Sequence, residues 1–276
     1  MTPRMNTRRL SIRQGMTMAM LTWVVLSGLY LCGLTTWLDR KLTDLHLRIR
    51  GEVEASDQIA LVTIDDKTFS KLGIWPLPRE NYALLLKILE DAGAKVIGVD
   101  LQFLGKSSNP RSDLLLAEVT AGYKNIVHAI SFPSDRESGV PGGQITDPAP
   151  EIVTRHGWLQ SSPEIPAADA VRAPYRQLLE AAPFLGHVDV GVDPDGCIRR
   201  IPMLIRHGDR VYPFMGLLVS ILEPGDSTLP ALHWTGHGFS VTGRTGVKRM
   251  IPTDRDGYTS IGFAGDRGAF RRSYSM

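Results

Sequence analysis

QIALVTIDD, at residues 58–66, and KVIGVD, at residues 95–100, decide the fold class of this chain. Each is a short apolar run that ends abruptly in aspartate, which is typical of a buried strand. Between them, residues 80–92 carry leucine, isoleucine and alanine at helical spacing, and Gly93 follows as a helix-ending glycine. A strand, a helix and a strand in this order predict a parallel pair with a right-handed crossover, and therefore an α/β fold.

The alternation of helices and strands continues toward the C-terminus. A helix is expected at 112–120, with Asp113 in its first turn, and a strand at 126–132. Residues 133–166 hold several glycines and prolines with little periodicity, which predicts a long surface loop with one short element near Trp158 and Leu159. A further helix is expected at 175–181, ended by Pro183.

From Phe184 onward the pattern changes to short strands separated by turn signals. Residues 186–192 and 198–206 flank the sequence DPDG at 193–196, and Asp-Gly is a strong turn dipeptide, so a hairpin is expected. An apolar helix is expected at 211–222. Further strands are expected at 233–241, 248–251 and 258–263. The predicted architecture is a mixed-sheet α/β domain with a β-rich second half.

An uncharged stretch precedes this domain, from Met16 to Leu38. As a helix it spans about 34 Å, enough to cross a hydrocarbon core of about 30 Å. A cleaved signal peptide has a shorter apolar region, of about 7–15 residues. A lipoprotein would carry a small residue before Cys32, where Leu31 stands. We therefore predict a cytoplasmic leader at 1–15, a transmembrane helix at 16–38 and an extracytoplasmic domain at 39–276.

The orientation of this segment depends on its flanking charges. Lysine and arginine are balanced, since Arg4, Arg8, Arg9 and Arg13 precede it and Arg40, Lys41, Arg48 and Arg50 follow it. The leader contains no acidic residue, whereas acidic residues mix with basic ones on the far side, and long domains translocate largely regardless of charge. We therefore expect the N-terminus inside and the large domain outside.

Composition excludes several classes of protein. The formal net charge of +2 is too small to indicate a nucleic-acid partner. The chain has two cysteines, and Cys32 and Cys197 are expected in different phases, so no disulfide framework holds the fold. We expect Cys197 to be a buried small residue, with an intermolecular bridge as the alternative.

Charged residues follow both strands that decide the fold class. If these strands are parallel neighbours, Asp65, Asp66 and Asp100 lie along the carboxyl edge, where ligands bind in open α/β sheets. Arg79 adds a cation at the start of the next helix, and Trp75 lies in the loop before it. The candidate ligand-binding residues are therefore Asp65, Asp66, Trp75, Arg79 and Asp100. The alternative is a structural clamp, in which Arg79 pairs with one of these aspartates and Trp75 plugs the sheet end.

No catalytic, metal or cofactor site is predicted. The zinc-protease, nucleophile-elbow, P-loop and dinucleotide-binding motifs are missing from the sequence. DPDG at 193–196 and DRDG at 254–257 resemble the opening of a calcium loop but lack its further ligands, so we interpret them as turns. His233 and His237 have the spacing of a metal-binding helix, but the glycines around them argue against a helix.

GIWPLPR at 73–79 is a distinctive run, and it occurs together with the following residues and runs: Ile64-Asp65-Asp66, Val96 to Asp100, Phe103, Asp113, Gly186-His187-Val188, Asp193 to Gly196 with Arg199, Arg200 and Pro202, Ile251-Pro252 and Asp256-Gly257. In these residues the chain resembles the type-2 CHASE domain, an extracellular sensory module of bacterial cyclases and histidine kinases. Leu77 stands where the family often has a second tryptophan. The resemblance covers about residues 40–270.

This resemblance implies a sensory domain outside a bacterial cytoplasmic membrane, attached by a single transmembrane helix. We expect a non-enzymatic module that binds an unknown small ligand and signals across the membrane, as a homodimer or with a signalling partner protein. Family members usually continue into further membrane helices and an output module, so a truncated receptor fragment is also expected. The alternatives are a protein-interaction or dimerisation module without a small ligand, and a hydrolase that uses the clustered aspartates.

Overall fold

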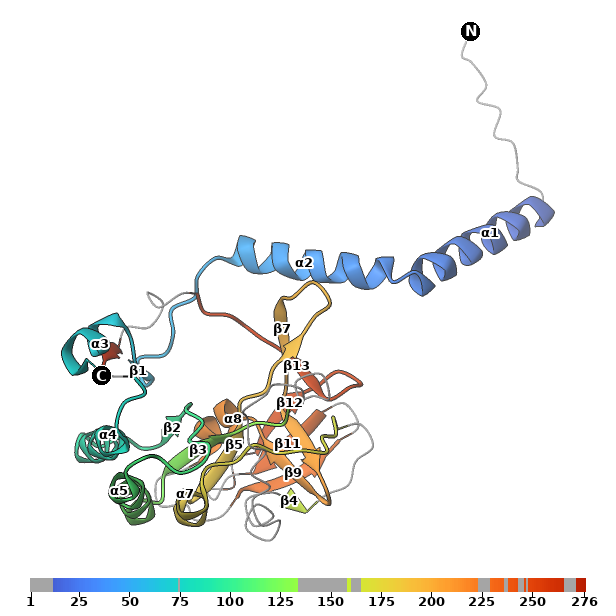
Figure 1. Cartoon of the computed structure of the whole chain (residues 1–276). Coiled ribbons are helices and arrows are strands. Elements are labelled where there is room, and N and C mark those ends of the chain that lie inside the picture. Colours follow the sequence, from blue (N-terminus) through green and yellow to red (C-terminus); the bar gives the residue numbers. More distant parts are fainter. Residues whose placement is uncertain are drawn as a thin grey trace. The chain divides into compact units, whose positions relative to one another are not determined.

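The computed structural model describes residues 12–73, 75–133, 158–159, 165–222, 229–235, 238–242, 246, 248–265 and 272–276. The chain divides into two units, which we describe separately: residues up to Val62 with Gly262–Tyr274, and Thr63–Ile261 with Ser275–Met276. Figure 1 labels the helices and strands. Most of the predicted leader, most of the predicted loop at 133–166, and His237 lie outside the described residues.

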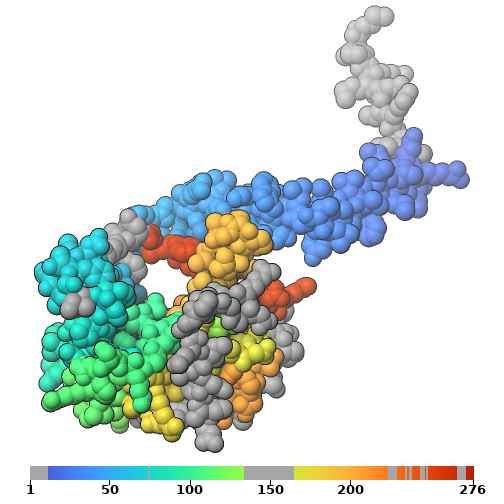
Figure 2. Space-filling view, in the orientation of Figure 1, coloured from blue at the N-terminus to red at the C-terminus, as the bar shows by residue number. Residues whose placement is uncertain are grey.

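Helix α1, Ile12–Leu31, holds most of the uncharged stretch. None of its residues is buried, and Figure 2 shows its side chains, in dark blue, exposed along the helix. Among the described residues it is the one helix long and apolar enough to cross a membrane. The helix ends before the predicted boundary at Leu38, because Gly33 turns the chain with φ 70, a left-handed conformation open to glycine.

Helix α2, Leu34–Arg50, takes up the last residues of the predicted transmembrane helix and the first residues of the predicted extracytoplasmic domain. Gly51, with φ 71, ends it. The Arg50 guanidinium donates a hydrogen bond to the Phe263 carbonyl, and the Val53 N–H donates to the Ala264 carbonyl at 2.7 Å. Strand β1, Ala60–Thr63, pairs with β14, Arg272–Ser275. The first unit therefore joins two segments that lie far apart in sequence.

The pairing of β1 corrects the predicted strand–helix–strand unit. β1 lies in a two-stranded sheet with β14, whereas β2, Ile97–Val99, pairs with β3, Ile126–Ile130. The prediction that the strands at 58–66 and 95–100 are parallel neighbours is therefore wrong. The parallel crossover occurs one step later, where α5, Pro110–Gly122, connects β2 to β3.

The central sheet of the second unit has the order β2-β3-β5 and is parallel throughout. Strand β5, Phe184–His187, pairs with β3 through Val127 and Phe184, and β2 pairs with β3 through Ile97 and Ile126. Every residue of β3 is buried. A parallel strand covered on both faces is typically a continuous apolar run, and β3 follows this pattern except at His128.

One face of this sheet is covered by helices. A core cluster joins Ile97 and Ile126 of the sheet to Leu86, Leu116 and Leu178 of three helices. These are α4 (Arg79–Asp91), α5 and α7 (Arg176–Ala181), which Figure 1 shows grouped together. The short helix α3, Asp66–Leu72, precedes α4 and was not predicted.

Helix α8, Met215–Ile221, covers the opposite face at close range. A Cβ atom at Gly186 would lie 2.6 Å from the Met215 Cα, and one at Gly98 would lie 3.0 Å from the Val219 Cγ2. Glycine at these positions therefore permits the approach of α8. The predicted helix at 211–222 is shorter in the structure, because its first residues form strand β9, Arg210–Pro213.

The second half is rich in strands, which form three small antiparallel sheets. The first has the order β4 (Trp158–Leu159), β9, β8 (Leu204–His207). The second has the order β10 (Ala231–Trp234), β11 (Gly238–Thr242), β12 (Lys248–Pro252). The third has the order β13 (Tyr258–Ser260), β7 (Ile198–Pro202), β6 (Gly191–Val192). The predicted hairpin is confirmed in β6 and β7, although β5 joins the parallel sheet instead. The mixed-sheet α/β class with a β-rich second half is confirmed.

Candidate functional site

Two of the predicted ligand-binding residues begin helix α3. The Asp65 carboxylate accepts the Thr68 N–H at 3.2 Å, which caps the helix, and it accepts the Ser275 hydroxyl at 2.8 Å. Asp66 is the exposed first residue of the same helix. Because β1 and β2 lie in different sheets, the reason for expecting these carboxylates beside Asp100 no longer holds.

Two other predicted residues are exposed. Trp75 is 60% exposed and packs edge-on against Phe69, with ring centroids 5.5 Å apart. Asp100 follows β2 and is exposed. That the five predicted residues bind a ligand stays a prediction.

Arg79 differs from the other four because it is buried. Its Nη1 donates a hydrogen bond to Oδ1 of Asp113 at 2.6 Å, and its Nη2 donates to the Gly105 carbonyl at 2.6 Å. The guanidinium also lies 4.1 Å from the centre of the Tyr175 ring. These contacts connect the starts of α4 and α5, the loop after β2 and the residue before α7. They are a structural clamp, with Asp113 as the partner rather than an aspartate of the predicted set.

Tyr175 and Asp113 are held in this clamp by further hydrogen bonds. The Tyr175 hydroxyl donates to the Asp113 carbonyl at 2.7 Å, and the Ser107 N–H donates to Oδ2 of Asp113 at 2.9 Å. Burial raises the pKa of Tyr175 to about 12, despite the nearby positive charge of Arg79. Further hydrogen bonds therefore engage both partners of the ion pair, as is needed to offset the cost of burying two charges.

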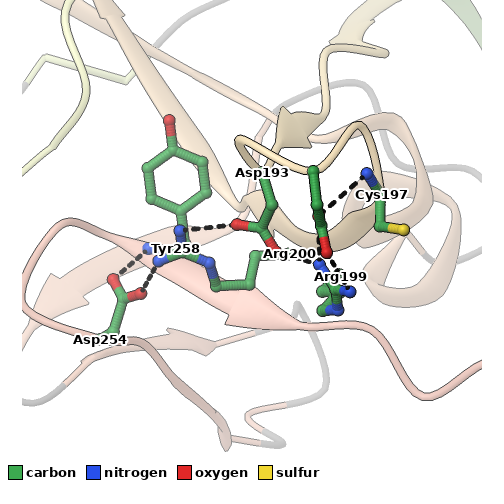
Figure 3. A network of polar contacts seen from close by, with 7 residues as sticks. Asp193, Cys197, Arg199, Arg200, Asp254 and Tyr258 are labelled. Carbon is green, nitrogen blue, oxygen red and sulfur yellow. Dashed lines mark hydrogen bonds and ion pairs between the residues drawn. The ribbon is translucent and has the colours of Figure 1, made fainter. Parts of the chain in front are cut away.

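A second charged network joins the two aspartate turns (Figure 3). Arg199 is buried and donates to Asp193 at 2.7 Å and to both oxygens of Asp195 at 2.9 and 2.8 Å. Arg200 donates to Asp193 at 3.3 Å and to Asp254 at 3.0 Å. Its guanidinium lies 5.3 Å from the centre of the Tyr258 ring. Both sequences act as turns, as predicted, but the structure also ties them to each other.

The turn at 193–197 exposes a thiol. Cys197 is exposed, so the prediction that it is a buried small residue is wrong. Its N–H is directed to Oδ1 of Asp195 at 3.3 Å, which turns the backbone while leaving the side chain outside (Figure 3). Cys197 is therefore exposed because it belongs to a turn and not to the core.

A third group lies where β3 and β5 end, and it was not singled out from the sequence. The Phe132 N–H donates to the carboxylate of Asp189, with both oxygens at 3.0 Å. The Phe132 ring contacts those of His187, His207 and Tyr212, with ring centroids 6.2, 5.9 and 5.4 Å away. The carboxyl ends of parallel strands are the usual place for a ligand in an α/β sheet. That rule could have directed attention here if β5 had been recognised as a parallel strand.

Two histidines of the sheet are fully buried. Burial lowers the pKa of His128 to about 4 and that of His187 to about 3, so both are neutral at physiological pH. Nε2 of His128 lies 3.2 Å from the Thr120 hydroxyl, whereas neither ring nitrogen of His187 has a hydrogen-bond partner among the described residues. No group of His, Cys, Asp or Glu side chains suited to a metal ion occurs in the described part of the chain.

The family model of the CHASE2 domain matches residues 19–276. The chain belongs to the CHASE2 family. CHASE2 is an extracellular sensory domain family, and this CHASE2 domain accordingly combines a sensory fold with an N-terminal helix able to span a membrane. No curated protein and no solved structure matches the chain. The charged residues of both networks, from Arg79 to Asp254, fall within the matched part of the CHASE2 domain.

Proposed function

We propose that the chain is a single-pass, membrane-anchored input domain, which senses a small ligand outside a bacterial cytoplasmic membrane and has no enzymatic activity of its own. The observation that supports this function best is the CHASE2 match together with α1, an apolar helix that buries none of its residues. A helix that is apolar all round and unburied is suited to a lipid environment. The domain after α1 would then face the outside.

The backbone suggests how the state of the domain would reach the membrane. The Ile261 N–H donates to the Arg199 carbonyl at 2.9 Å, at the network around Asp193. The next residues of the chain include Phe263 and Ala264, whose carbonyls are bonded at the C-terminal end of α2. One short stretch of chain therefore leads from the hairpin network to the helix that follows α1. A change in the turns would alter the strand β13 from which this stretch emerges.

Thiol labelling tests the placement of the domain directly. Cys197 is exposed, and after a Cys32→Ser substitution it is the remaining cysteine of the chain. We expect a membrane-impermeant maleimide to label Cys197 in intact cells. A Cys197→Ser, Ser11→Cys variant, with its thiol in the leader, is the matched control and should be labelled only after lysis. Labelling of Cys197 only after lysis would contradict an outside location.

Dimerisation is a second candidate function, favoured by the surface of α2. Leu38, Leu42, Leu45 and Ile49 are 49, 52, 51 and 77% exposed. Their spacing of four, three and four residues places them on one stripe of the helix, as at the core positions of a coiled coil. We propose a second copy of α2 as the partner of this stripe, because identical apolar stripes match each other in a symmetric pair.

Disulfide crosslinking in membranes tests this dimer. In a chain lacking its native cysteines, Leu42→Cys places a thiol within the stripe and Thr43→Cys places one outside it. We expect rapid crosslinking of two copies for Leu42→Cys and slow crosslinking for Thr43→Cys. Equal rates for the two variants would show that the stripe does not form the contact.

A further inference from the structure

The carboxyl edge of the β2-β3-β5 sheet holds buried polar atoms that have no hydrogen-bond partner in the described part of the chain. β3 ends at Ile130 and β5 at His187, so the two parallel strands present Phe132 and His187 at the same edge. Strand β9 lies beside β5 in Figure 1 and contributes Tyr212. Phe132, His187 and Tyr212, which we call the Phe132 cluster, therefore come from three separate elements.

The unpaired atoms are deeply buried. The side chains of His187 and Tyr212 belong to residues with 0% exposure, and among the described residues neither nitrogen of His187 nor the hydroxyl of Tyr212 has a hydrogen-bond partner. Oδ2 of Asp189 lies 3.7 Å from Nδ1 of His187, which is beyond a hydrogen bond. Native proteins leave few buried polar groups without a partner, and a bound water or ion is one recognised reason for such a group.

The surroundings of these atoms are largely aromatic, with the Asp189 carboxylate as a charged group beside His187. The His187 ring also contacts the Phe214 ring, with centroids 5.6 Å apart. Burial lowers the pKa of His187 to about 3 and raises the pKa of Tyr212 to about 12, so both side chains are neutral over the physiological range. Asp189 already accepts the Phe132 N–H, and Nδ1 of His207 donates to the Ala168 carbonyl at 3.0 Å.

We propose that the Phe132 cluster binds a small neutral molecule that carries both a hydrogen-bond donor and an acceptor, with a primary carboxamide as the simplest match. A neutral imidazole offers one N–H donor and one nitrogen acceptor, and a phenol offers a donor. A carboxamide has a carbonyl oxygen for the donors and an NH₂ group for the acceptor. An anion would lose its hydration and would meet the Asp189 carboxylate rather than a positive charge.

Three probes of nearly equal size separate the effects of a hydrogen-bond donor, a hydrogen-bond acceptor and a charge. Acetamide has a donor and an acceptor, acetone has only the acceptor, and acetate carries a charge. Thermal unfolding of the full chain in lipid nanodiscs is measured with each probe up to about 0.2 M, because a ligand of so few atoms binds in the millimolar range. We expect acetamide to raise the melting temperature by about 2–4 °C and acetate and acetone to have no such effect.

Tyr212→Phe removes the unpaired hydroxyl while keeping the ring, so the variant is expected to fold. It should abolish most of the acetamide shift, as should His187→Phe, whereas Tyr123→Phe removes a hydroxyl outside the cluster and should keep the shift. No shift with acetamide, an equal shift with acetone, or an undiminished shift in Tyr212→Phe would each overturn the proposal. The inference deepens the proposed sensory function and rests on it for its biological meaning, but the melting experiment and the labelling experiment can fail independently.

Discussion

Arg79 and Asp113 form a buried ion pair, with 2.6 Å between Nη1 and Oδ1 and with 10% and 4% of their side chains exposed. The pair joins the first turns of α4 and α5, two helices that pack on the same face of the sheet. Arg79 is also a residue that we had selected as a ligand contact. Its burial and its bonds to Asp113 and Gly105 give it a structural role, which can be tested by measuring stability.

We predict that Arg79→Ala lowers the free energy of unfolding by about 3–5 kcal/mol, because it leaves the Asp113 carboxylate buried without its partner. Urea unfolding of the full chain in nanodiscs, followed by tryptophan fluorescence, measures this change. Arg176→Ala is the control, since Arg176 pairs with Glu180 at 2.8 Å with 73% and 46% of the side chains exposed. That variant should cost less than about 1 kcal/mol. Similar effects for both variants would contradict the clamp.

The hairpin network allows a comparison of two aspartates that bind the same arginine. Asp193 and Asp254 both accept hydrogen bonds from Arg200, but their side chains are 4% and 37% exposed. Asp193→Asn should lower the free energy of unfolding by about 1.5–3 kcal/mol, because it weakens a buried charged hydrogen bond while Asp195 still pairs with Arg199. Asp254→Asn should cost about 1 kcal/mol or less, since solvent screens this pair. A larger cost for Asp254→Asn in the same urea assay would refute this ranking.

The stability of the domain should fall with acid. The unfolded pKa of histidine is 6.5, and the folded pKa is about 4 for His128 and about 3 for His187. The unfolded state therefore binds more protons below pH 6.5, so stability is complete above that pH and is lost as the pH falls toward the folded values. At about pH 5 each histidine should cost about 2 kcal/mol.

Urea unfolding at several pH values measures this acid dependence. His187→Gln should flatten the fall in stability between about pH 7 and about pH 5, whatever its effect on stability at neutral pH. The matched control is His233→Gln, which replaces an exposed histidine by the same residue. An unchanged slope in His187→Gln would show that His187 does not titrate as its burial implies.

The packing of α8 on the sheet depends on a glycine. Gly186→Ala would place a Cβ atom 2.6 Å from the Met215 Cα, so we expect a loss of about 1–3 kcal/mol from displacement of the helix. Gly122→Ala, in α5, meets nothing within 4 Å and should leave stability unchanged or raise it by up to about 1 kcal/mol. Calorimetric melting of both variants distinguishes these outcomes. Full stability in Gly186→Ala would mean that α8 can shift without cost.

The sequence by itself determined the class of the domain and the position of most elements. β3 and α5 were recognisable because burial imposes an apolar run on a central strand and a 3.6-residue period on a helix, and both patterns are local. The turns at 193–196 and 254–257 were recognisable for the same reason, since glycine and aspartate favour turn conformations wherever they lie. The resemblance to a sensory family, confirmed by the match over residues 19–276, was also readable from the sequence.

Which of these elements pair or pack together was known only from the tertiary structure. β1 pairs with β14 from the other end of the chain, Arg79 pairs with Asp113 instead of Asp65 or Asp100, and Arg200 joins two turns more than fifty residues apart. Local periodicity shows which face of a helix or strand is buried, but it does not show which residues cover that face. Partners separated widely in sequence are chosen by the packing of the whole domain, and the unpaired atoms of His187 and Tyr212 exist only because that packing encloses them.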